Sequence, residues 1–201
     1  MRILFNYLIF PGFLFSACIG LIAGWIDRKV TARIQWRVGP PWYQNFVDIV
    51  KLLGKETIIP QGAAKLTFLS APFLGLLSAV LVATILGVTA RLPLESFAGD
   101  LIVVLYLLII PAIAIIIGAS SSRNPLASIG ASREMKLVLG YELPFILSII
   151  VVIIKSAGTI QLGSILNHQI NFGSNLVSWS GILAFIVTIF CMQAKLCFVP
   201  F

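Results

Sequence analysis

An acidic residue stands in this sequence among near neighbours that are all apolar or aromatic. Glu142 follows Tyr141 and precedes Pro144. An ionisable group in a membrane-like setting costs about 2 to 3 kcal/mol or more, so it normally faces a partner or a wet cavity. Pro144 has no backbone N–H, so one carbonyl in the preceding turn lacks its helical hydrogen bond and is free to bind water near the acid. We interpret Glu142 as a proton-exchanging residue, and pairing with Arg133 or Lys136 near the membrane surface is the structural alternative.

Two more polar residues belong to this group of ion-coupling candidates. Lys195 lies near the end of another apolar stretch, where it either relays protons or extends its charged end to the surface. Asp27 closes the first apolar stretch, where it either pairs with Arg28 or Arg33 or takes part in proton transfer. The coupling candidates are therefore Glu142, Tyr141, Asp27 and Lys195. Two other acids, Glu95 and Asp100, are predicted to be solvated loop residues.

A run of cations follows the first apolar stretch. Arg33 and Arg37 are four residues apart, so on a helix they project from one face. The chain then breaks at residues 39–41, which read Gly-Pro-Pro. Residues 43–55 carry apolar side chains on one helical face and charged side chains on the other, which predicts an amphipathic helix lying on the membrane surface. Anchoring to lipid headgroups is the interpretation that the cations alone favour.

The elements that must position these residues follow from composition. The 201 residues are 59% hydrophobic and 10% charged, far from a typical globular chain, in which about a quarter of residues are charged. Five stretches reach the roughly 20 apolar residues that a membrane-spanning helix needs: 4–26, 67–90, 101–119, 138–157 and 177–199. They are apolar on every face, which excludes the alternating strands of a membrane barrel. We predict an all-α, multi-pass transmembrane bundle of about five helices in a single domain, 1–201.

Topology follows from the Lys and Arg residues, which are retained on the cytoplasmic side. Ten of the fourteen follow the first or third stretch and Lys195 lies near the end of the fifth, whereas the other three are Arg2, Arg91 and Lys155. The N-terminus is therefore predicted outside and the first and third loops inside. Topology explains the net charge of +7, so no nucleic-acid partner is inferred. The first stretch is too long for a signal-peptide core and is predicted to be an uncleaved anchor.

Cysteine and histidine usage argues against a redox centre in this chain. Cys18, Cys191 and Cys197 lie in apolar stretches without the close-spaced pairs that iron–sulfur or zinc sites use. His168 is the single histidine and is predicted in an outside loop, so an intramembrane bis-histidine haem cannot be built. We expect no catalytic residue, metal or cofactor on this chain itself. Any redox centre would come from partner subunits.

Two ordered patterns resemble a known family. The run Asp27-Arg-Lys…Arg33-Ile-Gln…Arg37-Val-Gly-Pro, followed by Asp48-Ile-Val-Lys…Lys55-Glu56, resembles the first cytoplasmic loop of the membrane subunit beside the peripheral arm of complex I (subunit 1 family, NADH-quinone oxidoreductase). Energy-converting, membrane-bound nickel–iron hydrogenases contain an equivalent subunit. Residues 124–134 and the run Gly-Tyr-Glu-Leu-Pro at 140–144 match a later segment of the family. Residues 39–41 and 51–60 look more like the hydrogenase branch.

The resemblance implies a membrane subunit of an oxidoreductase complex that has no redox centre of its own. It would dock a peripheral arm and couple electron transfer from ferredoxin to proton or sodium translocation. The implied partners are hydrogenase-like large and small subunits carrying iron–sulfur clusters and a nickel–iron centre, antiporter-like membrane subunits and lipid, in the plasma membrane. The residues implied in docking, or in lining a quinone chamber, are Arg28, Lys29, Arg33, Gln35, Arg37, Asp48, Lys51, Lys55, Glu56 and Arg133.

Alternatives to this interpretation stay open. In a quinone-reducing complex resembling complex I, with NADH, F420H2 or ferredoxin as donor, Arg33 and Arg37 would stabilise a reduced quinone headgroup. A stand-alone channel or carrier is less favoured, because the polar residues gather near one membrane surface. Family members are longer and have eight helices, so residues 1–201 are also compatible with the N-terminal part of such a subunit.

Overall fold

The computed structural model describes residues 2–195, and among these no residue forms a strand. Within these described residues four helices are long and apolar enough to cross a membrane, and the helix in the predicted fifth stretch, Trp179–Lys195, is apolar but shorter. The prediction of an all-α, multi-pass bundle is therefore confirmed. Contacts between residues group into two compact units, Met1–Ile59 and Pro60–Phe201. The single membrane domain stays a prediction, and each unit is described by itself below.

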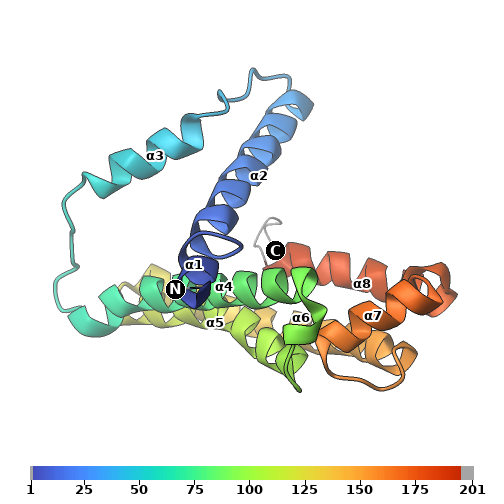
Figure 1. Cartoon of the computed structure of the whole chain (residues 1–201). Helices are drawn as coiled ribbons and strands as arrows, with labels where there is room; N and C mark the ends of the chain where they lie inside the picture. The colour runs from blue at the N-terminus through green and yellow to red at the C-terminus, as the bar shows by residue number, and fades with distance from the viewer. Residues whose placement is uncertain (1, 196–201) are drawn as a thin grey trace. The chain divides into compact units, whose positions relative to one another are not determined.

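The first unit contains α1 (Arg2–Leu8), α2 (Phe13–Ile34) and α3 (Gln44–Leu53) (Figure 1). The predicted continuous stretch 4–26 is interrupted between α1 and α2 by a turn with a cis bond before Pro11. At the far end, α2 continues eight residues beyond the predicted limit. Residues 27–34 contain no Gly or Pro, so nothing stops the helix before the Gly-Pro-Pro break. Arg28, Lys29 and Arg33 are consequently helical rather than loop residues.

The second unit holds the other spans. Its elements are α4 (Lys65–Arg91), η1 (Pro93–Glu95), α5 (Asp100–Ser121), α6 (Pro125–Lys155), α7 (Leu162–Phe172), η2 (Asn175–Val177) and α8 (Trp179–Lys195). Small residues let α4 and α5 lie close together (Figure 1), since a Cβ on Gly75 would stand 3.4 Å from the Cβ of Ala114. The same spacing holds for Gly118 and Ala71. Close approach at small residues is how helices gain packing contacts in lipid.

Two boundaries in the second unit differ from the sequence prediction. Helix α6 begins thirteen residues before the predicted position, because Asn124 caps it by accepting a 3.0 Å hydrogen bond from Leu126 N, and Pro125 occupies the first turn. Most of the predicted third loop is therefore helical. Helix α7, which carries His168, was predicted as loop because its eleven residues are too short and too polar to resemble a span. The last four residues of the predicted stretch 177–199 lie outside the described residues.

Asp100 corrects a prediction directly. It is completely buried, although its sequence position suggested a solvated loop residue. Its Oδ1 accepts hydrogen bonds from the backbone N–H groups of Leu101 at 2.8 Å and Leu162 at 2.7 Å. The Asp100 carboxylate therefore binds a backbone donor in the first turn of α5 and also holds the first residue of α7, a helix that the sequence did not reveal. Glu95, in η1, is exposed as predicted.

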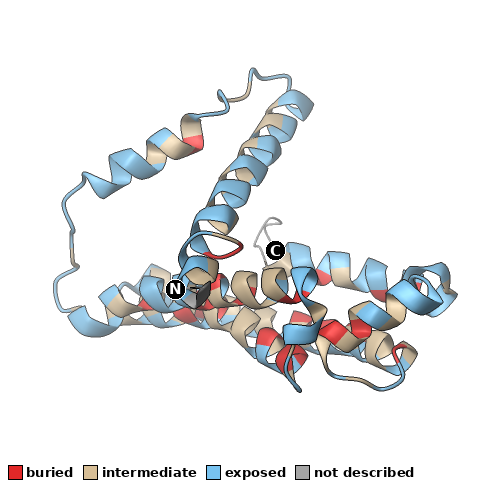
Figure 2. Cartoon of the chain, viewed as in Figure 1, coloured by how far each residue is buried: buried red, intermediate tan, exposed pale blue. Residues whose placement is uncertain are grey.

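The outer faces of the long helices remain apolar and uncovered (Figure 2). In the most apolar window of each span, no more than 22% of the residues are buried inside the protein. In water such surface would be strongly unfavourable, at about 25 cal/mol per Å². Lipid or neighbouring membrane subunits must therefore cover these faces.

Candidate functional site

The intramembrane acid of the second unit has a basic partner. The Lys195 Nζ on α8 lies 3.3 Å from the Glu142 Oε2 on α6, and the two side chains are only 9% and 15% exposed. The buried Nζ and both buried carboxylate oxygens have no hydrogen-bond partner among the described residues. The interaction between the two side chains is therefore electrostatic attraction without an aligned hydrogen bond. Within residues 2–195 neither Arg133 nor Lys136 is the ion-pair partner, so the surface-pairing alternative is wrong.

Aromatic rings enclose the Lys195 end of the pair. The Nζ lies 4.1 Å from the ring centroid of Phe145 and 5.7 Å from that of Tyr141. Both rings are buried and form a cluster with Cys191. A cation over an aromatic face gains electrostatic stabilisation of about 2 kcal/mol when desolvated. Tyr141 and Phe145 are four residues apart, as are Cys191 and Lys195, so each pair shares one helical face.

The depth of the pair follows from the length of α6. Lys136 and Lys155 are nineteen residues apart, which at 1.5 Å per residue is about 28 Å, close to the hydrocarbon thickness of about 30 Å. With the two lysines at the headgroup levels, Glu142 lies about 9 Å inside the hydrocarbon. An unpaired charge at that depth would be expensive, and the ion pair with Lys195 offsets part of this cost.

Two further polar contacts fix α8 along α6. Near the middle of the membrane the Thr188 Oγ1 donates to the Ser148 Oγ at 2.9 Å. At the end of α6, Lys155 donates to the Ser178 Oγ just before α8 begins. Among the described residues, the ion pair is therefore the last of three polar contacts that join α6 to α8 and to the residue just before it. A shift of α8 along α6 would separate the charges of the pair.

In the first unit, the predicted docking loop folds back onto α2. The Trp25 Nε1 donates to the Pro40 carbonyl at 3.1 Å, and the Lys29 Nζ lies 3.4 Å from the Gly39 carbonyl. A Cβ on Gly39 would stand 2.9 Å from the Lys29 Cδ and 3.1 Å from the Ala32 Cβ, so glycine permits this close approach. The loop is thus held against the helix, while the side chains of Arg33 and Arg37 stay exposed.

The predicted amphipathic helix is confirmed as α3, and its polar side is fastened to α2. The buried Asn45 donates from its Nδ2 to the Leu21 carbonyl at 2.7 Å. The Arg28 Nη1 lies 3.6 Å from the Asp48 Oδ2. Apolar residues of α3, among them Val50 and Leu53, remain exposed. A helix held in this way presents an apolar surface to lipid or to a partner.

The structure brings some of the predicted site residues together and leaves others apart. Glu142, Tyr141 and Lys195 form one cluster, whereas Asp27 is an exposed residue of α2. Most of the docking candidates are exposed, namely Arg28, Arg33, Gln35, Arg37, Lys51, Lys55, Glu56 and Arg133, whereas Lys29 and Asp48 are half-buried. Reasoning from the sequence missed Trp25 and Asn45, whose bonds hold the loop and α3 against α2. It also missed Phe145, although its spacing of four from Tyr141 was a usable signal.

No three His, Cys, Asp or Glu side chains among residues 2–195 gather as metal ligands. The expectation that partner subunits carry iron–sulfur clusters and a nickel–iron centre stays a prediction. The described side chains provide two functional features: a buried pair of opposite charges, Glu142 and Lys195, and an exposed basic loop.

Several known proteins are similar to this chain. The H subunit of NADH-quinone oxidoreductase from Thermomicrobium roseum is 37% identical over 186 residues, covering 84% of this chain and 54% of the relative. The corresponding protein from Desulfotalea psychrophila is 30% identical, covering 72% and 45%. A chain in the structure of the membrane-bound sulfane sulfur reductase, an archaeal respiratory membrane complex, matches with a TM-score of 0.80 and 31% identity, covering 97% of this chain and 62% of that one.

The chain thus spans about half the length of the curated relatives that it matches. The model of the NADH dehydrogenase family matches residues 7–201, nearly the whole sequence. This match confirms the resemblance seen in the loop and α6 motifs, while the preference for the hydrogenase branch stays a prediction. The chain belongs to the NADH dehydrogenase family of respiratory membrane subunits.

Proposed function

We propose that this chain is the membrane subunit that docks a peripheral redox arm and couples its electron transfer to ion movement. The Glu142–Lys195 pair carries the proposal, because it is a pair of opposite charges buried between two apolar helices. A pair of this kind is neutral as a whole while the helices are in register. When the helices shift out of register, the pair separates into two single buried charges, each of which is energetically unfavourable.

The coupling step follows from that energetic asymmetry. If a redox event in the arm displaces α8 relative to α6, Glu142 loses its cationic partner. A carboxylate isolated in an apolar setting neutralises by binding a proton, here one taken from water. Lys195, the last residue of α8, keeps its own proton by extending its charged end to the membrane surface. When α8 returns, Lys195 again favours the ionised form and the proton is released. Cyclic displacement therefore drives cyclic proton binding at Glu142, and a neighbouring membrane subunit can use that change of charge.

The first unit would receive the signal from the arm. Its loop presents Arg33 and Arg37 to solvent and is tied to α2 by Trp25 and Lys29. A surface with several exposed cations attracts an acidic protein face and fixes its orientation more than its affinity. Contact with the arm at this loop would thus act on a helix that crosses the membrane.

For the redox partner we favour a ferredoxin-linked, hydrogenase-like complex in the plasma membrane. Its arm would have large and small subunits with iron–sulfur clusters and a nickel–iron centre, and its other membrane subunits would be antiporter-like. The support is the motif at residues 39–41 and 51–60, together with the similarity to a chain of the archaeal sulfane sulfur reductase complex. The ion is a proton or sodium.

A quinone chamber beneath the basic loop is the second candidate, favoured by the relatives named as subunits of NADH-quinone oxidoreductase. In that case Arg33 and Arg37 would stabilise a reduced quinone headgroup. Purification of the native complex through this chain separates the two candidates. Nickel with hydrogen evolution from reduced ferredoxin supports the first, and bound quinone without nickel supports the second.

Ion coupling is tested with Glu142→Gln in the native complex. The expected result is a complex that assembles with lower stability, since Lys195 is left without its counter-charge, and that transfers electrons but does not translocate ions into proteoliposomes. Glu134→Gln, on the same helix but outside the buried pair, is the control and should translocate normally. Failure of Glu142→Gln to assemble would make the residue structural, and unchanged translocation would remove it from the coupling path.

A further inference from the structure

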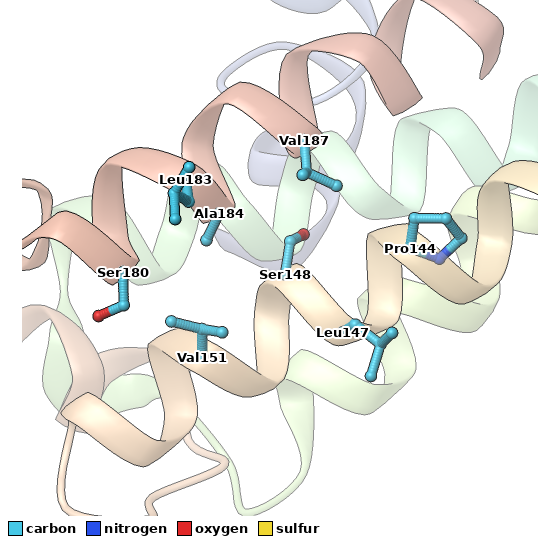
Figure 3. Close-up of a pocket in the computed structure, with 8 residues that line it drawn as sticks. All are labelled: Pro144, Leu147, Ser148, Val151, Ser180, Leu183, Ala184 and Val187. Atoms are coloured by element: carbon cyan, nitrogen blue, oxygen red, sulfur yellow. The ribbon is translucent and has the colours of Figure 1, made fainter.

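One side of the α6/α8 interface is a continuous apolar groove. Its first part, of about 400 Å³, runs along Pro144, Leu147 and Val151 of α6 against Ser180, Leu183 and Val187 of α8 (Figure 3). The second part, also about 400 Å³, continues from Pro144 and Val187 past Gly140 and Tyr141 to Lys136. The two parts share Pro144 and Val187, so they form one groove along the helix pair.

The groove is charged only at one end. Of the residues that line the second part of the groove, Lys136 is the one that carries a formal charge at neutral pH, and its side chain is exposed. Arg133 is exposed three residues earlier, and residues three apart are neighbours on a helix surface. Two cations therefore lie at one end of the groove. The distribution of Lys and Arg along the sequence predicts that this end faces the cytoplasm.

The length of the groove matches one leaflet of a bilayer. From Lys136 to Leu147 is eleven residues, or about 16 Å along α6, and half of the hydrocarbon thickness is about 15 Å. A chain whose headgroup lies at Lys136 would therefore end near the middle of the membrane, at Leu147. Beside the groove, Gly140 has no atom within 4 Å of the place where a Cβ would stand, so the space there is open.

We propose that this groove binds one anionic phospholipid of the cytoplasmic leaflet, with its phosphate at Lys136 and Arg133 and an acyl chain against Gly140, Tyr141 and Pro144. The positive end recognises the phosphate and the apolar length accepts the acyl chain. A polypeptide helix would also bury the groove, but a helix has no need for two cations at its mouth.

The bound lipid has a consequence for the buried ion pair. Tyr141, Cys191 and Ala194 line the groove on one side and belong to the cluster around Lys195 on the other. An acyl chain there keeps water away from the pair from the lipid side. Lipid binding does not depend on the proposed coupling function, whereas an effect of the lipid on ion translocation rests on it.

The test uses the native complex extracted in mild detergent, with the phospholipids retained by each variant measured by mass spectrometry. Lys136→Gln should weaken retention of anionic phospholipid about 5-fold, since one lysine near an anionic surface contributes about 1 kcal/mol. Gly140→Leu should block the groove and abolish retention at this site. The controls are Lys65→Gln, an exposed lysine at the start of α4, and Gly130→Leu, an α6 glycine with equally open surroundings.

A photoreactive residue at position 147 decides what occupies the groove. Crosslinking to phospholipid supports the proposal, and crosslinking to a polypeptide overturns it. Equal lipid retention in all four variants and the wild type also overturns it. If Gly140→Leu loses the lipid but translocates ions normally, the lipid site stands and its role in coupling is refuted. Loss of translocation by Glu142→Gln with normal lipid retention keeps the two proposals separable.

Discussion

Two ion pairs of this protein have similar geometry and opposite surroundings. Arg28 and Asp48 lie 3.6 Å apart with side chains 57% and 40% exposed. Lys195 and Glu142 lie 3.3 Å apart with side chains 9% and 15% exposed. Water screens the first pair, so each charge is tolerated alone. The second pair lies in an apolar setting where each charge needs the other.

The difference in exposure determines which of the two ion pairs can act as a switch. Separating exposed charges changes the free energy by about 0 to 1 kcal/mol, which is too little to drive a proton reaction. Breaking a buried pair costs about 3 to 5 kcal/mol, enough to change the protonation state of the acid. The basic loop is therefore suited to recognition, and the α6/α8 pair is suited to coupling.

The largest effect is expected from Lys195→Ala. It leaves Glu142 as a single charge in the membrane and should lower the free energy of unfolding by about 3 to 5 kcal/mol. Thermal or denaturant unfolding of the purified complex measures the change. The double variant Glu142→Gln with Lys195→Met removes both charges and should recover most of the loss. A single variant as stable as the wild type would contradict the buried-pair interpretation.

Asp100→Ala sharpens the comparison with a second buried acid, one whose Oδ1 is held by the backbone N–H groups of Leu101 and Leu162. Removing the acceptor leaves buried donors unsatisfied and should cost about 1 to 3 kcal/mol. Faster hydrogen exchange at the amide of Leu162 is the specific sign. Asp27→Ala, an exposed acid on α2, is the control and should leave that amide unchanged. Unchanged exchange in Asp100→Ala would show that α7 is held by other contacts.

The sequence was informative where a residue's own segment determines its environment. Apolar length revealed the positions of α4 and α5, and the alternation of polar and apolar faces revealed α3. An acid in an apolar segment pointed to Glu142. These predictions depend on the local composition and on the helical periodicity of apolar residues, and both can be read within a single segment.

The sequence was less informative where the environment comes from a distant segment. Lys195 could not be assigned to Glu142, because the contact joins residues fifty-three positions apart through the packing of α8 on α6. Asp100 was misread for the same reason, since its second hydrogen bond comes from Leu162. The early start of α6 was missed because a cap at Asn124 outweighs the polar composition of the first turns.

The smallest effect is expected at the exposed pair. A double-mutant cycle with Arg28→Ala and Asp48→Ala should give a coupling of about 0.2 to 1 kcal/mol in the free energy of unfolding. The cycle is needed because Asp48 also accepts a 2.9 Å hydrogen bond from the Gln44 Nε2, which a single variant would remove as well. The coupling should shrink at about 1 M salt, where charges are screened over about 3 Å. A coupling as large as that of the buried pair, or one insensitive to salt, would show that the first unit shields its charges from water and would remove the contrast between the two sites.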